Sequence, residues 1–126
     1  MNTKLIMAAS ALFLGSIGIL LSFAPREIAE YLQIAEAGFI LIQIMGALYF
    51  GFAILNWTAK GNIIGGIYSR PVAIGNFSHF FMASLALIKY LTSHPLAYGW
   101  ALTLFYLLFA LFFGYIFFFN PQVKPK

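Results

Sequence analysis

The sequence predicts an all-α integral membrane protein, a four-helix bundle of up-down topology that forms a single domain over residues 1–126. Hydrophobic residues make up 63% of the chain and charged residues only 8%, far below the roughly 25% charged residues of ordinary soluble domains. Four apolar stretches are each long enough to cross a hydrocarbon core of about 30 Å as a helix. We place these spans at residues 5–23, 38–57, 72–91 and 97–119.

The first span has some features of a cleaved signal peptide. Lys4 supplies a positive charge before the apolar run, and Ser22-Phe23-Ala24 resembles a cleavage site. The run is longer than the 7–15 apolar residues of a signal peptide, however, and Pro25 follows the site directly. We therefore expect residues 5–23 to be retained as the first membrane helix.

The connection after the first span predicts an amphipathic helix that lies in the outer membrane interface. Pro25 suits the first position of a helix, and an acidic residue follows in the first turn. Apolar residues recur at helical spacing, while polar residues gather on another face. The apolar set is Ile28, Leu32, Ala35 and Phe39, and the polar set is Arg26, Glu27, Glu30 and Gln33. We expect this helix to bend near Gly38 and run into the second span. Its expected role is structural, at the membrane interface, and the alternative role is a lid or a docking surface for a partner.

The distribution of charge predicts the orientation. With four spans, the termini and the middle connection share one side, which holds Lys4, Lys60, Arg70, Lys124 and Lys126 and no acidic residue. The other side holds two basic residues and all three acidic ones. This bias predicts that both termini are cytoplasmic, in a multi-pass protein of the bacterial inner membrane. The glycine-broken middle connection, residues 58–71, stays apolar, so we expect it to dip into the interface.

Each span carries a stripe of small or polar residues at a three-four spacing, which is typical of helices that pack closely in a membrane. We expect the tail that begins at Asn120 to end the last helix. The four stripes, in chain order, are Ala8, Ala11, Gly15, Gly18 and Ser22; Gln43, Gly46, Phe50 and Ala53; Asn76, His79, Ala83, Ala86 and Tyr90; and Trp100, Thr103, Leu107, Ala110 and Gly114. We expect these faces to form the helix seams and the opposite faces to contact lipid.

Polar side chains inside the spans are the only chemical clues. Asn76 and His79 share a face of the third helix, and Asn56 ends the second span at the same depth. We predict a cluster of Asn56, Asn76 and His79 in the cytoplasmic half, with Gln43 deeper toward the outside. The cluster either fixes helix packing through hydrogen bonds or lines a pocket that binds a head group, a quinone ring or another small polar-ended ligand.

The sequence lacks the residues that several classes of chemistry require. The chain has no cysteine, which excludes thiolate metal sites and disulfides. One histidine within the spans does not make a metal site, and no acidic residue lies inside a span for a proton relay. No basic patch with interleaved aromatics indicates nucleic acid. Catalytic residues and a cofactor are therefore not evident, and a quinone is the alternative cofactor.

Some segments resemble a known group of proteins. The glycine-rich second span, Gly46-Ala-Leu-Tyr-Phe-Gly51, the Asn56-Trp57 pair and the stretches Gly65–Pro71 and Asn76–His79 resemble the small DoxX-like bacterial membrane proteins. This resemblance implies a compact four-span bundle and a link with quinone-dependent redox chemistry. It maps no catalytic residue onto this chain.

Three functions follow as hypotheses. The first is a non-catalytic accessory protein, or a protein that binds a lipid or hydrophobic small molecule, using Asn56, Asn76, His79 and Gln43. The second is a redox or lipid-linked component that handles a quinone. The third is a small homo-oligomeric transporter, which the missing membrane carboxylate disfavours. The expected partners are the lipid bilayer and either further copies of the chain or another membrane protein.

Overall fold

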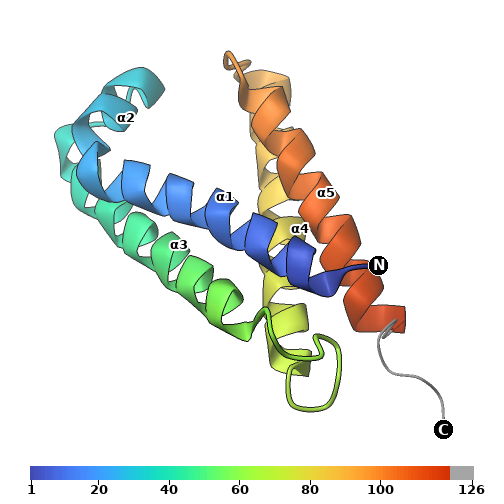
Figure 1. The fold of residues 1–126 in the computed structure, drawn as a ribbon. Helices are drawn as coiled ribbons and strands as arrows, with labels where there is room; N and C mark the ends of the chain where they lie inside the picture. The colour runs from blue at the N-terminus through green and yellow to red at the C-terminus, as the bar shows by residue number, and fades with distance from the viewer. Residues whose placement is uncertain (120–126) are drawn as a thin grey trace, which may run out of the picture. The chain divides into compact units, whose positions relative to one another are not determined.

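A computed structural model describes residues 1–119 of the chain. These residues form α1 (Thr3–Phe23), α2 (Pro25–Leu32), the short 3₁₀ helix η1 (Glu36–Gly38), α3 (Phe39–Ala59), α4 (Arg70–Ser93) and α5 (Gly99–Phe119), as Figure 1 shows. Within residues 1–119, four helices are long and apolar enough to cross a membrane: α1, η1 with α3, α4 and α5. The all-α class and the four long apolar helices are thus confirmed, and they indicate a membrane protein. The predicted stop at Asn120 lies outside the described residues.

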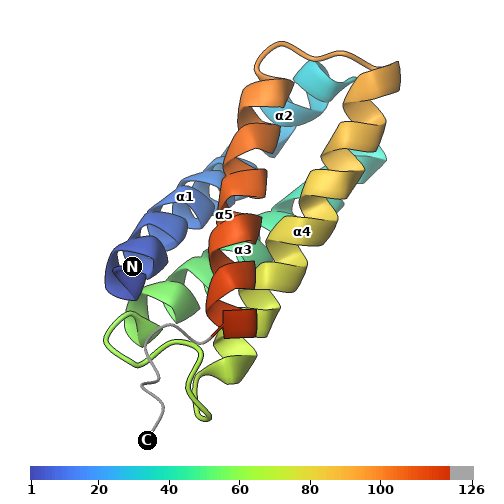
Figure 2. The same ribbon diagram turned by 90° about the vertical axis from the view of Figure 1, so that its right-hand side faces the viewer.

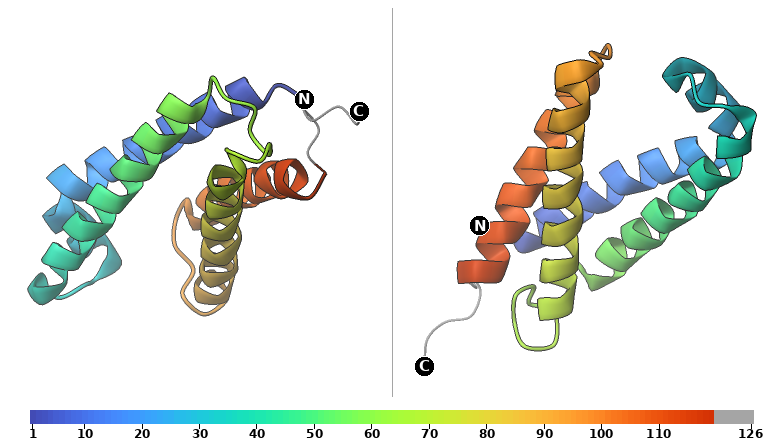
Figure 3. Two further views of the ribbon diagram at one scale, coloured as in Figure 1. Left: turned by 90° about the horizontal axis from the view of Figure 1, so that it is seen from below. Right: turned by 180° about the vertical axis from the view of Figure 1, so that it is seen from behind.

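The chain divides into two units, and each is described by itself. One unit comprises residues 7–60, and the other comprises residues 1–6 together with the chain from Gly61 onward. In the first unit α1 and α3 lie side by side, which Figures 1 and 3 show from different directions. In the second unit α4 and α5 form an antiparallel pair, seen most clearly in Figure 2.

The amphipathic helix α2 forms, but it is shorter than predicted. It begins at Pro25 and ends at Leu32, because Gln33 adopts the left-handed conformation with φ of 57°. The Gln33 N–H donates to the Glu30 carbonyl and the Ile34 N–H to the Ala29 carbonyl, the paired bonds of a Schellman helix end. The prediction that this helix continues into the second span is therefore wrong, since η1 restarts the chain at Glu36.

The two faces predicted for α2 are present. Ala29 is buried and Ile28 and Leu32 are half-buried, whereas Arg26, Glu27 and Glu30 are exposed. Ala35 does not belong to the apolar face, because it lies beyond the end of the helix and is exposed. The exposed face of α2 is thus the charged face.

The connection between α3 and α4 has no helix, as its glycines predict. Ile64 in this segment is buried, but Ile67 and Tyr68 are 89% and 98% exposed. The next residues begin α4, where Pro71 occupies the first turn, the place where a missing N–H costs nothing. Two large apolar side chains therefore protrude directly before the first turn of α4.

Large aromatic side chains fill much of the seam between α4 and α5. The Phe80 ring stacks on Phe109 with 4.9 Å between ring centroids and on Phe113 with 5.8 Å. Phe80 and Phe113 are fully buried, and aromatic pairs at these separations are attractive beyond their buried area. Ring packing is therefore a main contact between these two helices.

Candidate functional sites

The α1 and α3 backbones come close together where Gly18 faces Gly46 and Phe50. A Cβ atom added to Gly18 would lie 2.7 Å from the Phe50 nitrogen and 2.9 Å from the Gly46 carbonyl oxygen. A Cβ on Gly46 would lie 2.9 Å from the Gly18 carbonyl oxygen. Small residues permit such an approach in membranes, where packing rather than water drives helix association. The predicted seam through Gly18 and Gly46 is confirmed.

A buried hydrogen bond joins the same two helices further along. The Asn56 amide Nδ2 donates to the Ser10 Oγ at 3.0 Å, and the Ser10 hydroxyl donates to the Met7 carbonyl at 2.9 Å. Both side chains are fully buried. The position of Asn56 thus has a structural explanation, since its amide links α3 to α1.

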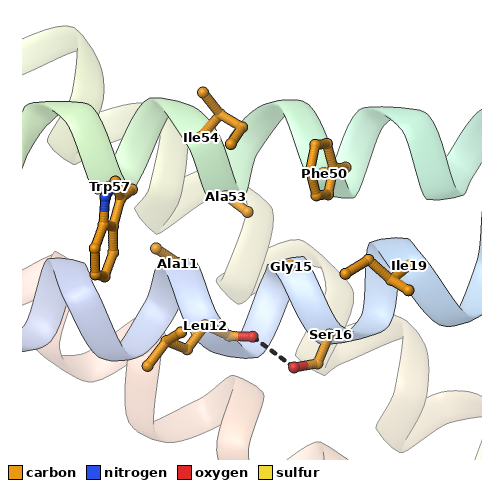
Figure 4. Close-up of a pocket in the computed structure, with 9 residues that line it drawn as sticks. All are labelled: Ala11, Leu12, Gly15, Ser16, Ile19, Phe50, Ala53, Ile54 and Trp57. Carbon is orange, nitrogen blue, oxygen red and sulfur yellow. Dashed lines mark hydrogen bonds between the residues drawn. The ribbon is translucent and has the colours of Figure 1, made fainter.

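Between these two points a groove runs along the surface of α1 and α3 (Figure 4). Its volume is about 340 Å³, within the range of small-molecule sites. Gly15 and Ala53 lie at the floor, where a Cβ on Gly15 would be 3.4 Å from the Ala53 Cβ. The full lining, hereafter the α1/α3 groove, is Ala11, Leu12, Gly15, Ser16, Ile19, Phe50, Ala53, Ile54 and Trp57.

The polarity of the α1/α3 groove is low except at one end. The only hydroxyl in the lining belongs to Ser16, which donates it to the Leu12 carbonyl at 2.8 Å, the bond drawn in Figure 4. Trp57 lies at the end of the groove opposite Ile19 and Phe50, and the Lys60 ammonium lies 2.9 Å from the centroid of its ring. The groove therefore offers an apolar channel that ends beside an aromatic ring and a cation.

In the other unit Asn76 and His79 lie on α4, three residues apart. Asn76 is fully buried, and its Nδ2 donates to the Val72 carbonyl at 2.9 Å. The His79 ring packs against Phe80 at 5.1 Å and Tyr106 at 5.7 Å between centroids. These contacts bring His79 together with the aromatic side chains of the α4–α5 seam.

A second apolar groove lies on the surface of α4 and α5 and has a volume of about 500 Å³. Gly114 lies against the Phe77 ring in this groove, because a Cβ there would be 3.0 Å from the edge of the ring. The Phe77 ring packs on Phe81 at 5.4 Å and on Phe118 at 5.6 Å. The lining, hereafter the α4/α5 groove, is Phe77, Phe81, Leu107, Ala110, Leu111, Gly114, Tyr115, Phe118 and Phe119.

The four residues predicted to bind a ligand belong to two different units of the chain. Asn76 and His79 share one face of α4, whereas Asn56 and Gln43 belong to the unit of α1 and α3. Gln43 is exposed, and its Nε2 lies 3.5 Å from the Ser22 carbonyl. A cluster of Asn56 with Asn76 and His79 stays a prediction. Neither groove was predicted, because the rings and aliphatic chains that line them look in the sequence like lipid-facing residues.

Comparison with known proteins adds no assignment: no family model, no curated protein and no solved structure matches this chain. The resemblance to DoxX-like proteins therefore stays a prediction. Within residues 1–119 no three His, Cys, Asp or Glu side chains gather as a metal site would require.

Proposed function

We propose that this protein is a non-catalytic membrane protein that binds the hydrocarbon chain of a lipid-like molecule in the α1/α3 groove. The observation that carries the proposal is that this groove lies between two fixed contacts. The Gly18–Gly46 contact holds the helices on one side, and the buried Asn56–Ser10 bond holds them on the other. The gap over Gly15 and Ala53 is thereby preformed, as ligand sites generally are.

The chemistry of the lining favours a hydrocarbon chain as the occupant. Aliphatic and aromatic side chains provide the walls, and the Ser16 hydroxyl already donates to its own helix. A chain that fills the groove would gain dispersion contacts that an unfilled gap between helices lacks. The polar end of the molecule would lie at Trp57, where Lys60 can meet it.

Native mass spectrometry of the protein from mild detergent tests this proposal. Ile54 lines the groove and is 50% exposed, so Ile54→Trp fills the groove from its outer wall without changing the helix seam. The matched control is Leu48→Trp, because Leu48 is an exposed residue of the same helix that does not line the groove.

We expect the wild-type protein to retain a lipid and Ile54→Trp to lower its occupancy by at least about tenfold, or ~1.4 kcal/mol, with Leu48→Trp unchanged. The mass of the retained molecule distinguishes an acyl lipid from a quinone. A bare wild-type monomer, or equal retention by both variants, would overturn the proposal.

A further inference from the structure

The α4/α5 groove has the length of one membrane leaflet. Along α5 its lining extends from Leu107 to Phe119, which corresponds to about 18 Å at 1.5 Å per residue. Half of a hydrocarbon core is about 15 Å. A partner helix would cover the whole thickness of the membrane, whereas this groove matches a single acyl chain that enters from one side.

Arg70 stands at the end of this groove. It precedes Phe77 by seven residues and Phe81 by eleven, so the three side chains lie along one face of α4. The guanidinium carbon of Arg70 is 5.1 Å from the centroid of the Phe117 ring. That ring in turn contacts Phe118, which lines the groove, at 5.0 Å. The cation is therefore held at the groove's end and not at its middle.

The neighbours of Arg70 indicate its depth. Arg70 is the first residue of the apolar helix α4, and the exposed Ile67 and Tyr68 lie three and two residues before it. Tyrosine is enriched at the level of lipid head groups, and an exposed isoleucine beside it favours the same layer. A guanidinium at this point meets phosphates rather than hydrocarbon.

No acidic residue balances this charge within the unit. The three acidic residues of the chain, Glu27, Glu30 and Glu36, all belong to the other unit. The planar guanidinium suits two-point hydrogen bonding to phosphate oxygens. An anionic occupant is therefore complementary to this end of the groove, and a zwitterionic one is less so.

We infer that the α4/α5 groove is a second lipid site, selective for an anionic phospholipid whose acyl chain lies over Gly114 and whose phosphate contacts Arg70. The site is separate from the α1/α3 groove and does not depend on it. It takes one chain from the leaflet at the Arg70 end, and its selectivity comes from the head group.

The experiment compares phosphatidylglycerol with phosphatidylcholine of identical acyl chains, added to the delipidated full-length protein in detergent and counted by native mass spectrometry. Arg70→Gln removes the cation at the groove. Lys89→Gln is the matched control, since it removes the other cation of α4, near the far end of the helix. Leu111→Trp fills the groove from a residue that is 70% exposed.

We expect the wild-type protein to bind phosphatidylglycerol about tenfold more tightly than phosphatidylcholine at one site. Arg70→Gln should remove this preference, Lys89→Gln should retain it, and Leu111→Trp should lose the site for both lipids. Equal binding of the two lipids by the wild type, or equal loss in Arg70→Gln and Lys89→Gln, would overturn the inference. Ile54→Trp, which fills the α1/α3 groove, should leave the preference for phosphatidylglycerol unchanged if the two sites are separate. A failure of the α1/α3 site can therefore be distinguished from a failure of the α4/α5 site.

Discussion

The carbonyl oxygens of Gly18 and Gly46 each occupy the place that a Cβ on the opposite residue would need, at 2.9 Å in both directions. This reciprocal contact fixes the separation of α1 and α3. It also limits the width of the α1/α3 groove, because the helices stay close as far as Gly15, where an added Cβ would lie 3.4 Å from the Ala53 Cβ. One backbone contact thus sets both packing and the shape of a site.

Gly18→Ala should destabilise the protein, because the nearest atoms are backbone and have little room to move. We expect a loss of about 1–3 kcal/mol in the free energy of unfolding, as for other overpacked interiors, measured by denaturant titration in detergent. Gly51→Ala is the control: nothing lies within 4 Å of its added Cβ, so it should be neutral or raise stability by up to ~1 kcal/mol. Equal effects of the two substitutions would contradict the close contact.

The hydrogen bond between Asn56 and Ser10 should appear as coupling in a double-mutant cycle. Asn56→Ala and Ser10→Ala each remove one partner of a buried pair. Coupling between side chains of membrane helices is of the order of 0.6–1.7 kcal/mol, and we expect a value in that range. If the two effects add within about 0.3 kcal/mol, the two side chains do not act as a pair.

Much of the fold follows from apolar stretches of the right length, and the α1–α3 seam follows from its small residues. The predicted stripe of α1 was Ala8, Ala11, Gly15, Gly18 and Ser22. The Gly15–Ala53, Gly18–Gly46 and Gly46–Ser22 contacts confirm its last three residues and Ala11 is buried, whereas Ala8 is only half-buried. The reason is physical: where backbones touch, only small residues fit, so the sequence marks the place.

The seam of α4 was predicted less well. Asn76 is buried as expected, but the stripe continues through Phe80, Ser84 and Leu91, while Ala86 and Tyr90 are exposed. Trp100 of the predicted α5 stripe is also exposed, and Phe113 is buried instead. Large rings pack this seam, and a phenylalanine that faces a helix cannot be told in the sequence from one that faces lipid.

His79 provides a test of the two roles foreseen for it. Its ring packs on Phe80 and Tyr106, so His79→Ala should lower the melting temperature by removing ring contacts of about 0.5–1.5 kcal/mol beyond the buried area. His79→Phe should recover most of the loss. Retained lipid should be unchanged in both variants; loss of a bound molecule in His79→Ala with an unaltered melting temperature would instead assign His79 to a ligand site.

The predicted orientation is testable because the chain contains no cysteine. Glu30→Cys and Tyr68→Cys each introduce one thiol at an exposed position. We expect a membrane-impermeant maleimide to label Glu30→Cys in intact cells and Tyr68→Cys only after permeabilisation, since the basic residues cluster on the Tyr68 side. The reverse pattern would place both termini outside.

The most direct test of lipid binding is photo-crosslinking with a phospholipid that carries a diazirine in its acyl chain, followed by mapping of the labelled residues by mass spectrometry. If the grooves hold lipid, we expect the label to be concentrated on groove residues. These are Leu12, Ile54 and Trp57 in the α1/α3 groove and Leu111 and Phe118 in the α4/α5 groove. Equally exposed side chains outside the grooves, such as Leu5, Leu48 and Leu104, should receive several-fold less. Uniform labelling of all of these residues would mean that lipid merely surrounds the helices, and that neither groove is a site.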